Sequence, residues 1–260
     1  MDLQLSGKRA IVTGGSRGIG LAVATALVAE GARVAVVARD ADALAAAAAQ
    51  IGAEPFAADT GSDSSVRSMV ESVVDGFGGV DVLVNAAARP ASAGTQVAAS
   101  ATSDDVVREE FEVKVLGYLR CARAVAPHMT AQGWGRIVNI SGLNARRSTS
   151  LVGSVRNVAV ASMTSALAAE LGPHGVNVTV VHPGITVTEK TPATLAAIAE
   201  AQDISEEEAL AGLAAGTTIG RLVTAAEVAD VVTFLCSPRS VAVNGDAVAV
   251  GGGVPGVTYY

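Results

Sequence analysis

The chain has 260 residues, 50% of them hydrophobic and only 3% aromatic, and a formal net charge of −7. This length can bury one substantial core, while the acidic balance and the lack of a Lys/Arg run exclude the basic footprint of a nucleic-acid-binding protein. With so few aromatics, the core has to be built from Ala, Val, Leu and Ile, which suit parallel strands covered by helices.

Several common features are not indicated by the sequence. Cys121 and Cys236 lie in apolar helical patterns and indicate small buried side chains rather than a disulfide. The three histidines have no ligand spacing, so we expect no metal site. The N-terminus lacks a signal-peptide pattern, and polar residues interrupt every long apolar stretch. We therefore expect a cytoplasmic protein with no membrane segment.

Strand and helix patterns alternate along the chain. Short Val- and Ile-rich runs predict strands, and apolar residues every three or four positions predict helices. The expected strands are Arg9–Thr13, Arg33–Ala38, Glu54–Ala58, Val80–Asn85, Arg136–Ile140, Val176–His182 and Asp246–Val250. The expected helices are Ile19–Glu30, Asp40–Ile51, Ser62–Phe77, Asp104–Gln132, Val152–Leu171 and Ala225–Cys236. This alternation predicts an α/β fold over residues 1–260, a single-domain Rossmann fold with a doubly wound parallel sheet and helices on both faces.

One segment departs from the alternation. Thr188–Gly220 is rich in Ala, carries the acidic run Ser205–Glu208, and predicts one or two helices inserted after a strand. Insertions at the carboxyl ends of strands often carry function, which favours a lid over a substrate site. A solvated helical excursion is the alternative.

The first strand runs into the glycine-rich turn Thr13–Gly20, which is followed by a helix. Glycines in this context permit a tight turn and let backbone N–H groups approach a pyrophosphate, whose charge the helix N-terminus then faces. The spacing is G-x-x-x-G-x-G. It predicts a dinucleotide site, because the turn lies between a strand and a helix within a continuing βαβ unit.

This turn and later segments resemble the short-chain dehydrogenase/reductase family from about Leu5 to Gly253. Asn85–Ala88 is similar to the family's Asn-Asn-Ala-Gly segment, and Pro183–Thr188 to its Pro-Gly-x-x-x-Thr segment. The resemblance implies a nicotinamide dinucleotide cofactor. The residues implied to bind it are Gly14, Ser16, Arg17, Gly18, Ile19, Gly20, Arg39, Asp59, Thr60, Asn85, Ala86, Ala87, Pro183, Gly184, Ile185 and Thr188.

Charge near the second strand bears on the choice of cofactor. An acidic residue closing that strand would bind a ribose 2′-hydroxyl, whereas an arginine would accept a 2′-phosphate. Ala38 occupies the acidic position, and Arg17 and Arg39 could flank a phosphate. This favours NADP, with NAD as the alternative if Arg39 is only a surface residue and Asp40 only a helix cap.

The resemblance also implies an active site of Ser, Tyr, Lys and Asn, with Tyr and Lys in a Y-x-x-x-K motif, and this sequence departs from it. From their flanks, the four positions fall on Gly142, Val155, Ala159 and Lys114, respectively. No Y-x-x-x-K occurs anywhere in the chain. A positioned general acid contributes roughly 10²–10⁴-fold to such a reaction. Another group therefore supplies the proton, or the reaction differs, or none takes place.

Three residues are candidates for the missing chemistry. Lys114 could act as acid, base or nucleophile if partly desolvated, or could be a structural ammonium. Ser141 could act if the turn is shifted, although its side chain would normally point to the other side of the strand. Asn144 could line the substrate pocket or be a turn residue.

Arginines gather near the same positions. Arg146, Arg147 and Arg156 could bind a substrate carboxylate or phosphate, or lie at the surface or at a subunit interface, which we expect for Arg156. The resemblance implies a homo-oligomer, a dimer or a tetramer, and the apolar C-terminal segment Val248–Tyr260 is compatible with this.

Two classes of function remain open. The first is an NADP(H)-dependent oxidoreductase acting on a small carbonyl or alcohol substrate through a non-standard site, or a non-redox lyase or isomerase on the same fold. The second is a catalytically inactive cofactor-binding protein or partner subunit, which could assemble with an active relative in a mixed oligomer.

Overall fold

The computed structural model describes residues 1–88, 98–147 and 150–256. Seven parallel strands form its main sheet, in the order β3-β2-β1-β4-β5-β6-β9. Their bounds are Arg9–Thr13 (β1), Arg33–Ala38 (β2), Glu54–Ala57 (β3), Val82–Asn85 (β4), Gly135–Ile140 (β5), Val176–Pro183 (β6) and Ala247–Val250 (β9). The predicted doubly wound parallel sheet is confirmed. The strand order reverses between β1 and β4, where folds of this kind open a ligand crevice.

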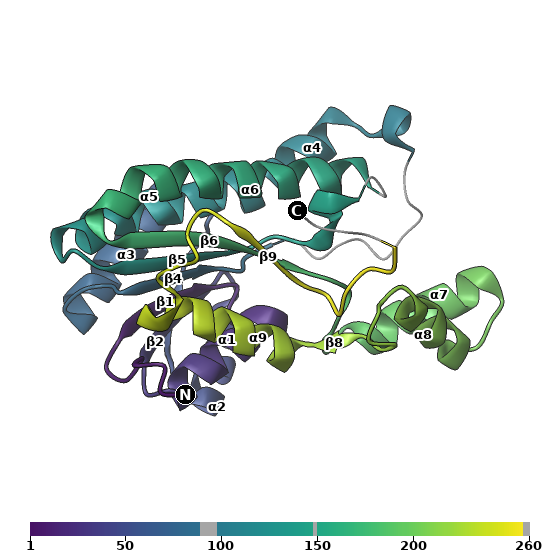
Figure 1. Cartoon of the computed structure of the whole chain (residues 1–260), viewed down its shortest axis with the longest axis horizontal. Coiled ribbons are helices and arrows are strands. Elements are labelled where there is room, and N and C mark those ends of the chain that lie inside the picture. Colours follow the sequence, from purple (N-terminus) through teal and green to yellow (C-terminus); the bar gives the residue numbers. More distant parts are fainter. Residues whose placement is uncertain (89–97, 148–149, 257–260) are drawn as a thin grey trace.

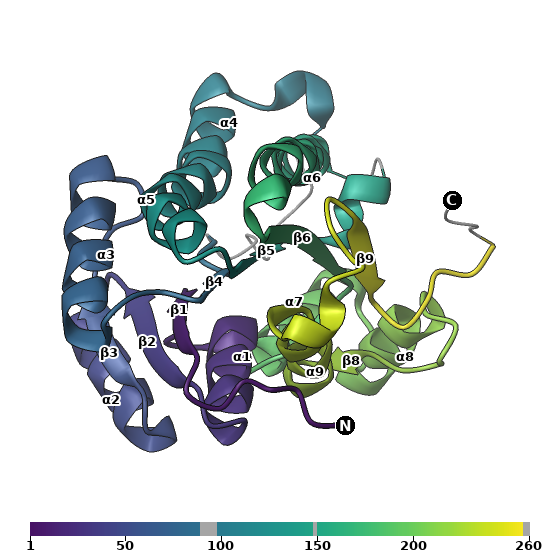
Figure 2. The ribbon, with the colours of Figure 1, turned by 60° about the vertical axis from the view of Figure 1, so that its left-hand side comes forward.

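Helices cover both faces of the sheet (Figures 1 and 2). One face carries α1 (Gly18–Ala29), α2 (Ala41–Ile51) and α9 (Ala225–Cys236), and the other carries α3 (Asp63–Phe77), α5 (Gly117–Ala131) and α6 (Leu151–Leu171). Short 3₁₀ turns lie at Ala99–Ala101, Leu143–Arg146, Gly172–His174 and Pro238–Ser240. Apart from shifts of a few residues at their ends, these helices match the expected ones, except for Asp104–Gln132.

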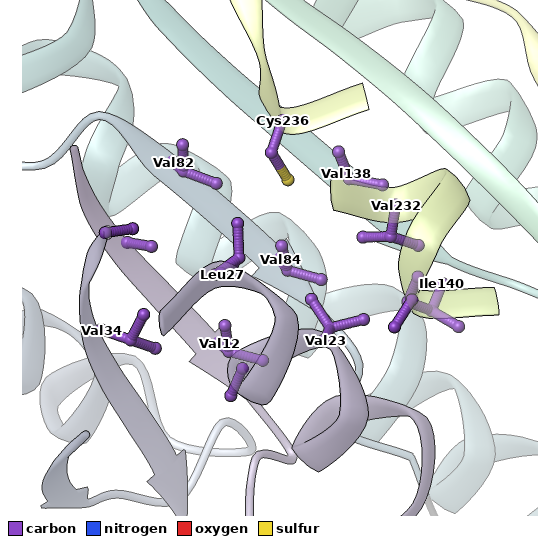
Figure 3. Packing of buried hydrophobic residues seen from close by; sticks show 14 of the residues in the cluster. Val12, Val23, Leu27, Val34, Val82, Val84, Val138, Ile140, Val232 and Cys236 are labelled. Atoms are coloured by element: carbon purple, nitrogen blue, oxygen red, sulfur yellow. The ribbon is translucent and has the colours of Figure 1, made fainter. Parts of the chain in front are cut away.

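A hydrophobic core lies on each face of the main sheet, and both cores consist mostly of Ala, Val, Leu and Ile side chains. Figure 3 shows one of them, where Val12 and Val84 of the sheet face Val23 and Leu27 of α1 and Val232 of α9. All five side chains are fully buried. At about 25 cal/mol per Å² of apolar surface, each buried Val or Leu stabilises the fold by about 1.5–3 kcal/mol.

The expected long helix over Asp104–Gln132 is divided in the structure. It consists of α4 (Asp104–Glu110), a π-helical turn (Phe111–Leu116) and α5. A π turn accommodates one residue more than an α-helical turn and is common at functional sites. Lys114 lies within it.

Thr188–Gly220 contains two helices, α7 (Thr191–Gln202) and α8 (Glu206–Ala215). Figure 1 shows the pair projecting away from the main sheet. A two-stranded ribbon of β7 (Thr186–Val187) and β8 (Val223–Thr224) anchors the excursion at both ends. The acidic run has a local role, since Ser205 and Glu208 form a capping box at the start of α8.

Helix α6 and the turn after it, Leu151–His174, are long and apolar enough to cross a membrane by length and composition alone. As expected from the sequence, polar residues interrupt this stretch, among them Ser154, Arg156 and Asn157. In the fold, α6 packs on the sheet through Asn157, Val160, Thr164 and Ala168. Its opposite side is partly exposed and apolar.

Candidate functional site

A cavity of about 1390 Å³ opens at the carboxyl ends of the central strands. It extends from Arg39 and Asp59, past the glycine-rich turn, to Lys114 and Asn144. Every predicted cofactor-binding and catalytic residue lines it except Asn85. Segments far apart in the sequence thus meet at one site, as expected at the switch point of a parallel sheet.

The glycine-rich turn lies directly against the end of β4. Gly14 has φ +68°, and a Cβ atom there would lie 2.8 Å from both Ala86 O and Ala87 N. Thr13 Oγ1 accepts hydrogen bonds from the same two residues, from Ala86 N at 3.1 Å and Ala87 N at 3.2 Å. At Gly20, a Cβ atom would collide with the Gly14 carbonyl. Only glycine permits this close packing of backbone on backbone.

The N-terminus of α1 is arranged to receive an anion. The side chain of Arg17, the residue before the helix, does not cap it, so backbone N–H groups there are open to other acceptors. Gly18 N donates to the carboxylate of Glu189 at 3.2 Å, which shows that negative charge is accepted at this point. Together with the steric fit of the glycines, these residues suit the pyrophosphate of a dinucleotide.

At the end of the cavity near Arg39 and Asp59, the arginine and aspartate side chains have different environments. Arg17 and Arg39 are exposed and line the cavity. Asp40 caps α2, its carboxylate accepting from Ala43 N at 3.1 Å. Asp59 accepts from Gly61 N at 2.9 Å. The acids are therefore bound to backbone N–H groups, while the guanidinium groups face the cavity and solvent.

Asn85 does not reach the cavity. It is fully buried, and its Nδ2 donates to Asn139 Oδ1 at 2.9 Å. Asn139 Nδ2 in turn donates to Thr164 Oγ1 at 2.9 Å. These bonds connect β4, β5 and α6, so Asn85 holds the layers together beneath the site.

Lys114 lies at the end of the cavity opposite Arg39 and Asp59. Its Nζ donates to Ser141 O at 2.9 Å, and burial lowers the pKa of this ammonium group to about 8. In the described part of the chain, no carboxylate is at ion-pair distance from Nζ. The ammonium group is thus near its titration point at physiological pH, and the low-dielectric surroundings strengthen its interactions with a ligand.

Tyr118 follows Lys114 by one helical turn and also lines the cavity. Its hydroxyl donates to Ile140 O at 3.0 Å. Burial raises the pKa of this phenol, so it stays protonated and bound to the carbonyl. Lys114 and Tyr118 therefore hold two consecutive carbonyl groups at the end of β5.

Ser141 and Gly142 lie against α6. The Ser141 hydroxyl donates to Asn157 O at 3.1 Å. A Cβ atom at Gly142 would lie 2.9 Å from Asn157 Nδ2. The asparagine amide thus occupies the space next to Gly142 where a serine side chain would extend.

The expected assignment of the family's tyrosine and lysine positions to Val155 and Ala159 is wrong. Val155 is 45% exposed, and neither residue lines the cavity. The helix instead directs Asn157 into the cavity and packs Gly153, four residues earlier, against Asn144. A Cβ atom at Gly153 would lie 3.0 Å from Asn144 Nδ2, and Asn157 is 4% exposed and lines the cavity. The residues that the helix places next to the site thus lie two positions earlier than expected, and neither is a tyrosine or a lysine.

The arginines separate into different roles. Arg147 and Arg156 line the cavity, and Arg156 forms an ion pair with Glu110 at the end of α4. Arg156, for which we expect a position at a subunit interface, is only 14% exposed at its side chain in the single chain. Arg146 instead donates to Ala247 O at 3.1 Å and holds β9.

Sequence reasoning missed several residues of the site, among them Asn157, Glu189 and Lys190. Asn157 was obscured by the register error, although a lone amide in an apolar helix is a usable signal. Glu189 and Lys190 also line the cavity, and neither lies in a motif. Two residues of α8, Gly212 and Leu213, and two residues just after it, Gly216 and Thr217, line it as well.

Comparison with known proteins gives consistent matches over nearly the whole chain. The family profile described as enoyl-(acyl carrier protein) reductase matches residues 14–255. The short-chain reductase protein NovJ of Streptomyces niveus is 36% identical over 252 residues, which cover 95% of this chain and 93% of that protein. Sorbitol dehydrogenase of Cereibacter sphaeroides is 33% identical, covering 92% of this chain and 93% of that one.

Solved structures agree. L-sorbose reductase of Gluconobacter frateurii, complexed with NADPH and L-sorbose, has a TM-score of 0.90 at 30% identity and covers 99% of this chain and 100% of that chain. An actinorhodin polyketide ketoreductase variant with NADPH has a TM-score of 0.88 at 32% identity, covering 96% and 98%.

Proposed function

Because the chain belongs to the short-chain dehydrogenase/reductase family, we propose that it is an NADP(H)-dependent oxidoreductase in which Lys114 replaces the usual proton-transfer residues. Its substrate is a small carbonyl or alcohol compound. The observation that carries the proposal is the continuity of the cavity, which joins the glycine-rich turn to a buried ammonium group.

The cofactor is held along the cavity by the residues already described. The glycine-rich turn and the N-terminus of α1 receive the pyrophosphate, and Asp59 lies at the adenine end. Arg17 and Arg39 favour NADP over NAD, and two structural relatives are NADPH complexes. When bound, the nicotinamide supplies or accepts the hydride.

Lys114 supplies the proton. Reduction of a carbonyl takes up one hydride at carbon and one proton at oxygen. An ammonium group with a pKa of about 8 is protonated at neutral pH and can donate to the developing alkoxide. Asn144 binds the substrate oxygen or a neighbouring group. Ser141 positions α6, since its hydroxyl is bonded to Asn157 O.

Other parts of the chain complete the proposal. The segment 188–220 acts as a lid, supported by the residues of α8 that line the cavity. A homodimer or homotetramer forms through α6, whose apolar residues Leu151, Val155 and Val158 are 42%, 45% and 50% exposed in the single chain. The net charge of −7 suits a cytoplasmic location.

A second function has one observation in its favour. Neither Gly153 nor Val155 of α6 offers a hydroxyl, and the described tyrosine that lines the cavity, Tyr118, donates to a carbonyl. A cofactor-binding partner subunit without catalysis of its own, or a non-redox lyase or isomerase, would be consistent with this.

The test is NADPH oxidation and NADP⁺ reduction across carbonyl and alcohol panels. Turnover by the wild type should fall about 10²–10⁴-fold in Lys114→Met and persist in the matched variant Lys8→Met, which lies outside the cavity. Carbonyl reduction should decline as pH rises above about 8, because the ammonium group loses its proton. Tight NADPH binding with no turnover on any panel member would favour the partner subunit.

A further inference from the structure

The substrate end of the cavity carries more positive than negative charge. Lys114, Arg147 and Arg156 all line it. Within residues 1–88, 98–147 and 150–256, one carboxylate is at ion-pair distance from these three cations, that of Glu110, which contacts Arg156. Among these described residues, the other two cations, Lys114 and Arg147, have no carboxylate partner.

These cations differ in exposure, and two of them are largely removed from water. Lys114 is 5% exposed as a residue, and the Arg156 side chain is 14% exposed. The buried Nε atom of Arg156 also has no hydrogen-bond partner. Removing a cation from water costs free energy unless a partner compensates it. An anion in the cavity would supply this compensation.

The acids that line the cavity do not provide it. Asp40 and Asp59 lie at the other end and accept from backbone N–H groups. Glu189 accepts from Gly18 N at the start of α1. Among the described residues, the acids near the glycine-rich turn are thus bound to backbone N–H groups, while cations outnumber acids at the Lys114 end of the cavity.

We infer that the substrate carries an oxyanion group, a carboxylate or a phosphate, which is bound by Arg147 and Arg156. This inference rests on the proposed function for the identity of the pocket. Guanidinium groups bind such oxyanions through paired, charge-assisted hydrogen bonds. Lys114 is then left for the reacting oxygen. The substrate differs in charge from the neutral sugar in the L-sorbose reductase complex.

The test uses matched anionic and neutral probes in titration calorimetry with NADP⁺ present. The pairs are D-ribose 5-phosphate with D-ribose, and 4-oxopentanoate with its methyl ester. In at least one pair the anion should bind tenfold or more tightly than its neutral partner. Arg147→Gln should reduce this preference about tenfold, because the exposed Arg147 has no carboxylate partner in the described chain. Arg67→Gln, on α3 and outside the cavity, should leave it unchanged.

The outcomes are distinct. A preference for one pair only identifies the group as phosphate or carboxylate. Equal affinity within both pairs, no binding of either anion, or a preference that survives Arg147→Gln in a folded protein overturns the inference. Selective anion binding without turnover on any panel would contradict the proposed hydride transfer and support the oxyanion site. Turnover of neutral substrates alone would support the hydride transfer and contradict the oxyanion site.

Discussion

A side chain at Gly142 would meet Asn157, since a Cβ atom there would lie 2.9 Å from the Asn157 amide nitrogen. The two positions belong to different elements, the end of β5 and the second turn of α6. They have to change together, because the amide of one occupies the space that a side chain at the other would need.

This coupling predicts the behaviour of a restored serine. Gly142→Ser alone should lower the free energy of unfolding by about 1–3 kcal/mol, because the amide has to move. Combined with Asn157→Ala, the same substitution should cost clearly less than the sum of the two single changes. Urea denaturation of the four proteins measures this coupling. Gly76→Ser is the control, because nothing lies within 4 Å of a Cβ atom there. Strict additivity would contradict the contact.

Lys114 should make stability depend on alkaline pH. Burial lowers its pKa to about 8, below the value of about 10.4 in an unfolded chain, so the unfolded chain binds this proton more tightly. Between about pH 8 and pH 10, the stability of the wild type should therefore rise relative to Lys114→Met. Parallel denaturation curves of the two proteins across this range test it, and a constant difference would show that the ammonium group is not desolvated.

Arg39 should set the preference for the phosphorylated cofactor. Arg39→Ser removes a cation next to the expected 2′-phosphate and should weaken NADP⁺ binding about 10–100-fold, with little effect on NAD⁺. Fluorescence titration with both cofactors measures the ratio. Arg33→Gln is the matched control, since Arg33 lies at the other end of β2, where it pairs with Glu54. An unchanged ratio would assign the phosphate to other residues.

Gly14 should tolerate no side chain. Gly14→Ala combines a φ of +68° with the approach of Ala86 O to 2.8 Å, so both stability and cofactor affinity should fall. Gly52→Ala carries the same conformational penalty at φ +75°, but its nearest neighbour is Val28 Cγ1 at 3.9 Å. The difference in unfolding free energy between the two variants isolates the close approach, and equal values would show that the turn can relax.

Much of this site is predictable from local sequence. The glycine spacing, the strand that precedes it and the helix that follows it determine where a pyrophosphate can lie, and these residues do line the cavity. The register of α6 was not predictable in this way. Most of its residues are apolar or small, so its flanks align almost equally well two residues apart, and only packing against Gly142 and Asn144 selects Gly153 and Asn157.

The break in the helix before Lys114 was also hidden. The residues Phe111–Leu116 have ordinary helical preferences, and no proline or glycine marks the π turn. Likewise, Arg156 and Glu110 are 46 residues apart, and their pairing depends on α4 lying over α6. Long-range contacts of this kind leave no periodic signal in a single sequence.

The π turn also affects how the chain can vary. Because it holds one residue more than a regular turn, deleting a single position within Phe111–Leu116 would yield a continuous α-helix, in which the upstream residues keep their orientation relative to α5 while the side chains within the turn change direction. Lineages of this protein that keep the buried amine should therefore conserve the length of this stretch more strictly than the identity of most of its residues.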